Sequence, residues 1–359
     1  MKSIIFIAGM VLLAASTYAQ GCVAIRGTGA ICTMADHQGM NDNKSHSKWQ
    51  VNIGYRHFKS YKHFRGTHEE KERVINNTEV INWQHTLDVS VLYNINQRWS
   101  VMLGMPLVAN KRSSLYEHGR TSRHNTESYG LSDMRLVVYR WLIHPEKAKK
   151  GNIQLGVGLK FATGDYNYQD YFYNVGPNGT AALRPVDQSI QPGDGGTGLI
   201  TELNGFYNFS QRFGFYGNLF YMMNPKEVNG TLTYRSNQHE QVMSVADQYM
   251  GRLGINYAFA GKLKPLSTSV GIRTEGIPVE DLLGGNLGFR RPGYVWSVEP
   301  GINWMSKKAV WSLTVPVAVH RNRTQSIPDK LTTAETGVYR HGDAAFADYS
   351  INLGVSFRM

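Results

Sequence analysis

The stretch from Tyr349 to Met359, Tyr-Ser-Ile-Asn-Leu-Gly-Val-Ser-Phe-Arg-Met, alternates apolar residues with small or polar ones over its whole length. Because successive side chains of a β-strand point to opposite faces, this segment has one apolar and one polar face. Similar segments, separated by turn residues, recur along the chain. Such a series is typical of a transmembrane barrel, in which one face of each strand meets lipid and the other faces the lumen.

Twelve such segments are predicted as strands, and short turns alternate with longer loops between them. Their approximate ranges are 49–55, 87–95, 99–107, 134–138, 153–161, 199–207, 213–221, 249–257, 270–272, 296–304, 311–317 and 349–359. The predicted fold class is therefore all-β: an antiparallel up-and-down barrel spanning residues 48–359, with short periplasmic turns and long extracellular loops. Pro106, Pro300 and Pro316 fall within these segments, so bulges or strand ends are expected there.

The N-terminus has the features of a secretory signal peptide, with cleavage after Ala19. Lys2 is followed by an apolar run from Ile4 to Ala15, which is too short to span a bilayer as a helix. No later run approaches 18 consecutive apolar residues, so no helical span is expected. Residues 20–47 form an N-terminal periplasmic segment, and the predicted location is the outer membrane of a Gram-negative bacterium.

The two cysteines lie in this segment, at Cys22 and Cys32. Because export places them in an oxidising compartment, a disulfide between them is predicted. Two alternatives are a metal site with His37 and His46, although CxxC spacing is missing, and lipidation of Cys22, although Gln20 lies close upstream.

The net charge of +11 bears on the partners of the chain. Export argues against nucleic acid, and the Lys and Arg residues are spread through turns and loops. Contact with anionic lipid head groups and lipopolysaccharide, or attraction of anions to the pore mouths, is expected instead. The strand Tyr349–Met359 is the segment expected to contact the barrel-assembly machinery.

Aromatic residues occur at or near the ends of many outward-facing runs, often beside the short turns. They are Trp49, Tyr93, Trp99, Tyr207, Phe213, Tyr257, Trp304, Trp311 and Phe357. This placement predicts an aromatic girdle at the membrane interface, although aromatic residues also favour strands in general.

If the apolar set faces lipid, the charged residues within the strands must face the lumen, because Arg or Lys facing lipid costs about 2–4 kcal/mol near the midplane. The inward charges are Arg56, Asp88, Asp133, Arg135, Lys160, Glu202, Arg252, Arg273, Glu275 and Glu299. Their balanced signs predict an ion-paired network across a narrow lumen. Such a network either stiffens the wall and selects nothing, or lines a path for a small solute.

Inward aromatic residues, Tyr139, Phe206, Tyr216 and Phe220, would make part of that lumen apolar. Twelve strands enclose a space between that of filled eight-stranded barrels and that of open sixteen-stranded porins. A lining of aromatic and charged residues suits a monoaromatic or similarly small amphiphilic solute better than bulk water.

Catalysis has little support, and no metal or cofactor is predicted. Candidate rim residues for a hydrolase are Asp247, Asp343, His320 and His341, but no motif fixes their geometry. His57, His63 and His68 are interpreted as part of a solvated basic loop. The run Gly193-Asp194-Gly195-Gly196 lacks a following Lys-Ser/Thr and a helix, so it is interpreted as a turn.

Several short motifs are more distinctive than turns require. They are Gly130-Leu131-Ser132-Asp133-Met134-Arg135, Phe161-Ala162-Thr163-Gly164-Asp165-Tyr166, Gln191-Pro192-Gly193-Asp194-Gly195-Gly196, Arg273–Pro278 and Gly288–Tyr294. From about residue 50 onward the chain resembles the outer-membrane barrels of the meta-pathway phenol-degradation family, in which three such motifs occur in this order. Ala162 departs from that pattern, which usually has Pro. The resemblance implies a transporter-like barrel that handles aromatic compounds, and it supplies no catalytic residues.

Arg290 and Arg291 are predicted to anchor a loop folded into the pore, with Glu275 and Glu299 as partners. The sequence thus predicts a passive channel for small solutes, with no enzymatic activity. Two alternatives are a structural or adhesive barrel with a closed lumen and partner-binding loops, and a hydrolase at the rim.

Overall fold

The computed structural model describes residues 20–21 and 47–359. The predicted signal peptide and the proposed Cys22–Cys32 disulfide lie outside the described residues. No helix among these residues is long and apolar enough to cross a membrane.

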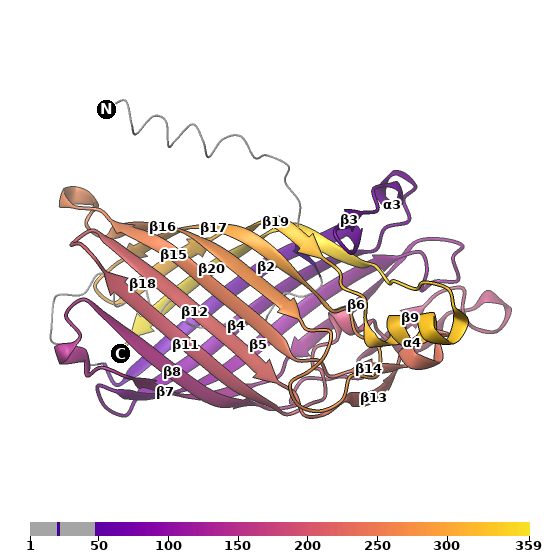
Figure 1. Ribbon diagram of the computed structural model, residues 1–359, viewed down its shortest axis with the longest axis horizontal. Coiled ribbons are helices and arrows are strands. Elements are labelled where there is room, and N and C mark those ends of the chain that lie inside the picture. Colours follow the sequence, from indigo (N-terminus) through magenta and orange to yellow (C-terminus); the bar gives the residue numbers. More distant parts are fainter. Residues whose placement is uncertain (1–19, 22–46) are drawn as a thin grey trace.

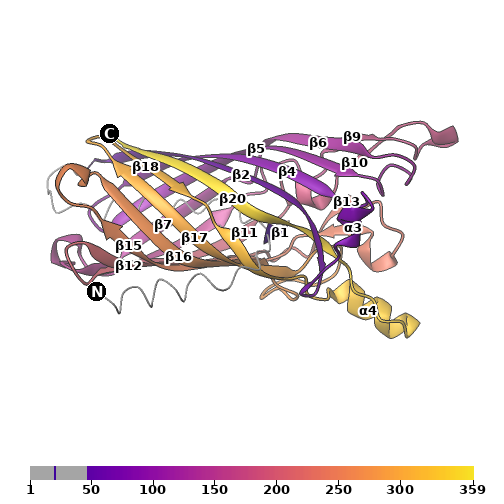
Figure 2. The same cartoon turned by 90° about the horizontal axis from the view of Figure 1, so that it is seen from above.

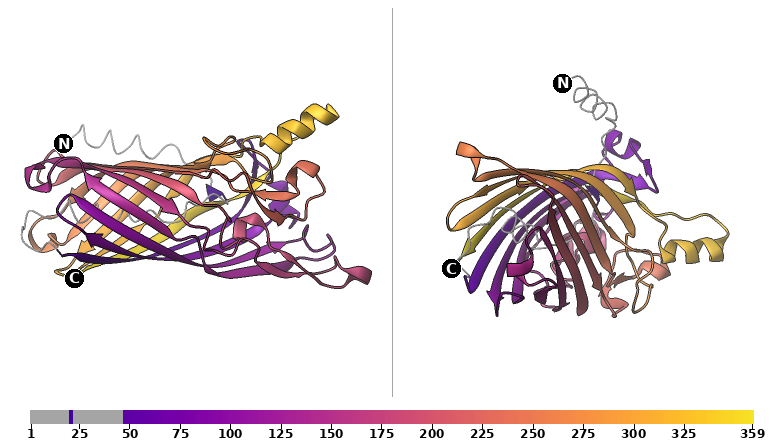
Figure 3. Two further views of the ribbon diagram at one scale, coloured as in Figure 1. Left: turned by 90° about the horizontal axis from the view of Figure 1, so that it is seen from below. Right: turned by 60° about the vertical axis from the view of Figure 1, so that its left-hand side comes forward.

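The described chain forms a closed antiparallel barrel of twelve strands, which confirms the predicted fold class. The barrel strands are β2 (Trp49–Arg65), β4 (Ile81–Asn94), β5 (Trp99–Ser114), β7 (Arg135–Trp141), β8 (Gly151–Lys160), β11 (Gly198–Asn208), β12 (Phe213–Met223), β15 (Gln248–Ala258), β16 (Leu266–Ile277), β17 (Gly293–Met305), β18 (Ala309–Thr314) with its continuation β19 (Val317–Asn322), and β20 (Ala344–Arg358). Each pairs with its neighbour in sequence, and the first and last strands pair from Gln50–Arg358 to Phe64–Ala344 to close the sheet. Figure 1 shows the strands steeply tilted, and the right-hand view of Figure 3 looks toward one end of the barrel.

Two strands are interrupted, and each interruption lies opposite a proline. Strand β6 (His124–Leu131) continues β7 beyond Ser132–Met134, and Pro106 of β5 faces this gap, where its carbonyl accepts the Ser132 amide at 2.7 Å. The break between β18 and β19, at Val315-Pro316, faces Pro300 of β17, whose carbonyl accepts the Val315 amide at 3.1 Å. Proline cannot donate to a ladder, so Pro106 and Pro300 are accommodated inside strands where the neighbouring strand is itself broken.

The two ends of the barrel differ. The turn end carries the connections 95–98, 142–150, 209–212, 259–265 and 306–308, together with the C-terminus, on the left of Figure 1. The loop end carries the connections between the other strand ends, and part of it projects beyond the wall in Figure 2. Its small elements are β3 (His68–Glu69), α3 (Glu72–Ile75), β9 (Gln169–Phe172), β10 (Ala182–Pro185), β13 (Val228–Leu232), β14 (Val242–Ser244) and α4 (Ile327–Thr336). The short strand β1 (Gln20–Gly21) pairs with β20.

Burial is inverted relative to a water-soluble protein. Leu253 is 66% exposed on the outer face, whereas Arg273 on the neighbouring strand is only 5% exposed and faces the lumen. At the turn end, outward Trp49 packs on Tyr93 with ring centroids 4.7 Å apart, and Trp304 pairs across strands with Trp311. An apolar belt edged by aromatic residues is what the hydrocarbon layer of a bilayer requires.

The strands extend farther toward the loop end than the alternation predicts. Strand β2 runs to Arg65, so His57 and His63 lie in a strand and His68 lies in β3, which corrects the prediction of a solvated loop. On the outer face His57 stacks on His85 at 4.3 Å. Beyond the apolar belt both faces of a strand can be polar, and the hydrophobic alternation that reveals a strand is therefore lost.

Candidate functional site

A ladder of ion pairs runs along the lumen side of β2, β15, β16 and β17. Glu275 accepts from Arg56 at 3.3 Å and from Arg273 at 2.8 Å. Arg273 also pairs with Glu299 at 3.2 Å, and Glu299 with Arg252 at 3.4 Å. All five predicted lumen charges on these strands therefore meet in one network, with Glu275 completely buried.

Two further contacts lie on the opposite wall. Arg135 pairs with Asp88 at 2.8 Å, and its guanidinium lies against Gly104, where an added Cβ would be 3.4 Å from it. The Tyr139 hydroxyl donates to Glu202 at 3.0 Å. These four residues were predicted to face the lumen, and the structure places them there in separate pairs rather than in the ladder.

Apolar side chains also face the lumen. A buried cluster between the two polar walls consists of Leu92, Met102, Val137, Tyr139, Ile200, Phe220, Met222 and Met250. From the sequence, only Tyr139, Phe220 and Met222 of this cluster could be assigned to the lumen. The other members are apolar residues at inward positions, which interrupt the expected alternation of apolar and polar residues. The lumen is therefore partly filled rather than lined only by polar groups.

The other predicted lumen aromatics lie apart from this cluster. Tyr216 lies across Gly254 and Gly271, where an added Cβ would be 2.5 Å from its hydroxyl oxygen, so glycine is needed at both positions. Phe206 is the cross-strand partner of Tyr216, and it makes an edge contact with Trp141, with ring centroids 6.1 Å apart. Tyr216 and Phe206 thus extend the aromatic lining toward the turn end.

The segment Val186–Gly196 enters the lumen from the long connection between β8 and β11, and we call it the crossing segment. Its Asp187 carboxylate accepts from both terminal nitrogens of Arg291, at 2.9 and 2.7 Å, and pairs with Arg112 at 3.4 Å. The same carboxylate accepts the Ser189 amide at 3.0 Å and caps a 3₁₀ turn. These arginines hold the pKa of Asp187 well below its usual value, despite the opposing effect of burial.

Hydrogen bonds tie the crossing segment to both sides of the barrel. The Gln188 side chain donates to the carbonyls of Ser244 and Phe289, at 2.8 and 3.0 Å. From the other wall, Gln84 donates to the Ser189 carbonyl at 2.7 Å. The Ile190 carbonyl accepts hydrogen bonds from Asn110 of β5 and Ser128 of β6. The segment therefore bridges the lumen between β4–β6 and the loops that pack opposite.

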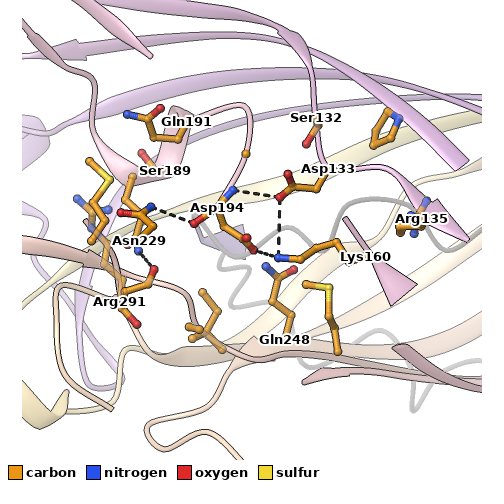
Figure 4. Close-up of a pocket in the computed structure, with 18 of the residues that line it drawn as sticks. Ser132, Asp133, Arg135, Lys160, Ser189, Gln191, Asp194, Asn229, Gln248 and Arg291 are labelled. Carbon is orange, nitrogen blue, oxygen red and sulfur yellow. Dashed lines mark hydrogen bonds and ion pairs between the residues drawn. The ribbon is translucent and has the colours of Figure 1, made fainter. Parts of the chain in front are cut away.

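Asp133 joins the crossing segment to the strand interruption described above. One carboxylate oxygen accepts the Gly164 amide and the other the Asp194 amide, each at 3.0 Å. Lys160 lies 3.8 Å from Asp133 and bonds to Asp194, as Figure 4 shows. The predicted lumen charges Asp133 and Lys160 thus meet a third residue, Asp194, whose sequence motif is typical of a turn.

A cavity of about 140 Å³ lies beside this junction. Its lining combines side-chain amides, charged groups and apolar groups. The amides are Gln84, Gln188, Gln191 and Gln248, and the charged residues are Asp133, Arg135, Lys160, Asp194 and Arg291. The apolar residues include Phe220, Met222, Met243 and Ile277. The cavity therefore offers a bound molecule both an apolar surface and polar side chains, which include hydrogen-bond donors and acceptors.

Arg290 and Arg291 do hold loops together, but the predicted partners are wrong. Arg290 forms two 2.8 Å bonds to Asp281, and Arg291 binds Asp187. Glu275 and Glu299 are occupied by the ladder. The sequence gives no register between distant loops, so the partner acids could not be chosen. The neighbouring Gln191–Gly196 motif was the one signal that this loop has a special role.

The rim residues considered for a hydrolase belong to different networks. Asp343 bonds to His63, whose other ring nitrogen bonds to the Val80 amide at 2.8 Å. His341 bonds to the carbonyl of Arg323, and Asp247 accepts from Tyr221 and Asn224. Among the described residues, no group of three His, Cys, Asp or Glu side chains is arranged to hold a metal.

A buried histidine at the loop end makes the rim sensitive to acid. His118 stacks on Phe172 at 5.5 Å and accepts the Tyr173 amide at 3.0 Å. Burial, reinforced by His124, lowers its pKa from 6.5 to about 4. The unfolded chain therefore binds the extra proton between these pH values, so stability present above pH 6.5 is lost as the pH falls toward 4.

We expect amide hydrogen exchange in residues 115–124 and 172–173 to accelerate as the pH falls through that range, after correction for intrinsic rates. The variant His118→Phe keeps a stacked ring but cannot titrate, so its corrected rates should be flat. Equal pH dependence in the two proteins would assign the change to other groups.

A closed barrel with an apolar exterior, a charged lumen and a segment across that lumen has the architecture of outer-membrane β-barrels. The crystal structure of the COG4313 outer membrane channel from Pseudomonas putida F1 matches 89% of this chain and 99% of that chain, with a TM-score of 0.59 and 10% identity.

Two other barrels are less similar. The toluene transporter TodX from P. putida has a TM-score of 0.41 at 9% identity, covering 94% of this chain and 96% of that one. The CymD monoaromatic hydrocarbon channel has a TM-score of 0.42 at 10% identity and 94% coverage of both. No protein-family model and no curated protein sequence matches the chain. The likeness to the COG4313 channel therefore supports the fold alone.

Proposed function

We propose that this chain is a passive outer-membrane channel for small aromatic or otherwise amphiphilic solutes. The observation that carries the proposal is the lumen cavity, in which Phe220 and Met222 lie near Lys160 and several side-chain amides. Its volume of about 140 Å³ is close to that of an engineered cavity that holds benzene, roughly 150 Å³. The resemblance of its motifs to those of the meta-pathway phenol-degradation barrels favours the same class of solute.

The proposal includes the membrane and its partners. The exterior belt would lie in the outer membrane with the turn end toward the periplasm, as in single-chain bacterial barrels. Lipopolysaccharide would surround the loop end. The C-terminal alternation of Tyr349–Met359, most of which lies in β20, is the segment we assign to contact with the assembly machinery.

Solute uptake by proteoliposomes tests the channel. Phenylalanine and glutamine are similar in size and both zwitterionic, so neither crosses lipid readily. We expect phenylalanine to enter about threefold faster, the factor that an aromatic contact of roughly 0.7 kcal/mol provides. Phe220→Asn should remove that preference without lowering the glutamine rate. Uptake of neither solute above the rate of protein-free liposomes would overturn the proposal.

The crossing segment favours one competing function, a structural barrel whose loops bind a partner. Its contacts with both walls, through Gln188 and Gln84, would keep the lumen shut if they never open. A refolded protein that passes no ionic current in planar bilayers would support this alternative and leave the barrel itself intact.

A further inference from the structure

The basic residues of the barrel are unevenly distributed between its two ends. The turns at the turn end and the strand ends beside them carry Lys48, Arg98, Arg140, Lys147, Lys149, Lys150, Arg212, Lys262, Lys264, Lys307, Lys308 and Arg358. Glu146 is the one acidic residue in this part of the described chain. At the loop end and in the lumen of the described chain, acids and bases are close to balanced, so its net positive charge is concentrated at the turn end.

Many of these cations surround a hollow at the mouth of the lumen, which we call the vestibule. The vestibule has a volume of about 840 Å³. Its basic lining residues are Lys149, Lys150, Arg212, Lys264, Lys307, Lys308 and Arg358, and no acidic residue lines it. The inward side chains Asn256 and Ser356 bound it together with the exposed Phe213, so it extends from the interior of the barrel to the rim of the wall.

Most of these charges are not neutralised by the protein. Lys264, Lys307 and Lys308 are exposed, and none forms an ion pair with any described residue. The lumen differs, because Arg252 and Arg273 there are each paired with Glu299. A paired lumen contributes little net field, and the vestibule therefore dominates the potential along the pathway.

Clustered charges of one sign at a mouth with low-dielectric walls concentrate counter-ions. The Debye length is about 8 Å at physiological ionic strength, so the fields of neighbouring lysines that line the same hollow overlap. Anions should be enriched there and cations depleted. Selection by charge is thus separated from the cavity near Phe220, where the apolar lining lies.

We propose that the vestibule makes this channel anion-selective, and that its solutes are small aromatic or otherwise apolar anions such as carboxylates. This inference rests on the proposed channel function and adds the charge of the solute to it. The apolar cavity accommodates the ring, and the vestibule attracts the acid group toward the turn end. The asymmetry also predicts a current that depends on the sign of the voltage.

The test is the permeability ratio of benzenesulfonate to phenyltrimethylammonium, two aromatic ions with permanent and opposite charges. It is obtained from reversal potentials of the refolded protein in planar bilayers of neutral lipid. We expect the sulfonate to be preferred about fivefold at low salt. The preference should fall as the ionic strength rises, because salt screens exposed charges.

Two sets of variants assign the effect to the vestibule. Changing Lys264, Lys307 and Lys308 to Gln should lower the ratio part of the way toward one, because four other basic residues still line the vestibule. Changing the same three lysines to Glu should bring the ratio close to one. The matched control changes three exposed loop-end lysines, Lys59, Lys71 and Lys330, to Gln and should leave the ratio unaltered. Because all six side chains are exposed, folding should be preserved in each variant.

Three outcomes would overturn the inference. These are a ratio near one in the wild-type protein, equal effects of the two sets of variants, and a preference that vanishes when anionic phospholipid is added to the bilayer. The last outcome would indicate that these basic residues bind anionic lipid head groups rather than the solute. Absence of any current would instead refute the channel function itself, so the two failures can be told apart.

Discussion

Replacing residues 187–193 with a Gly-Ser segment of equal length should raise the single-channel conductance about tenfold, toward that of an unobstructed twelve-stranded barrel. The replacement removes the Asp187 ion pairs with Arg112 and Arg291, and it removes the Gln188 bonds to the opposite loops. Without them, the flexible segment loses its ion pairs and keeps only weaker contacts, such as the bond from Gln84 to the backbone carbonyl at position 189, to hold it across the lumen. Planar-bilayer recordings of the refolded protein provide the measurement.

The matched control is a Gly-Ser replacement of residues 174–180, between β9 and β10, which leaves the crossing segment untouched. Its conductance should equal that of the wild-type protein. If both replacements left the conductance unchanged, the crossing segment would not lie on the conducting path. A rise in both would point to general loosening of the long connection rather than to release of a barrier.

The barrel could be predicted because lipid imposes a simple rule on its strands. Apolar residues at every second position, as at Leu353, Val355 and Phe357, report the outward face, and closure follows from the need to satisfy every strand edge in the membrane. Beyond the hydrocarbon layer this rule no longer applies, because both faces of a strand can be polar there. For that reason the loop-end part of β2, with His57 and His63, has no alternation that distinguishes it from a loop.

The candidate site was only partly predictable. Charges such as Arg273 and Glu299 could be assigned to the lumen from the alternation of side chains along each strand. Their pairing follows because the two strands that carry them are adjacent in the sheet. Asp187 and Asp281 come from loops, and their partners depend on how chains far apart in sequence fold back into the barrel. No local sequence pattern indicates where such a loop packs inside the barrel. The Gln191–Gly196 motif marked the right loop without revealing that it enters the lumen.

Glu275 should be the most sensitive position in the ladder for stability. It is fully buried and accepts from Arg56 and Arg273. Changing it to Gln leaves three arginines and a single acid, Glu299, in the ladder, and breaking a buried ion pair typically costs about 3–5 kcal/mol. We expect a loss of that size in the free energy of unfolding, measured by urea titration of the protein in lipid vesicles with tryptophan fluorescence.

Two comparisons separate the ladder from a general effect of lost charge. Glu127→Gln breaks an exposed pair with Lys111, 3.1 Å long, and should cost less than about 1 kcal/mol. The double variant Arg56→Leu with Glu275→Leu removes one charge of each sign, so it should recover part of the stability lost by Glu275→Gln. If the two glutamine variants lost equal stability, water would be solvating the ladder, and its ion pairs could not be what stiffens this wall of the barrel.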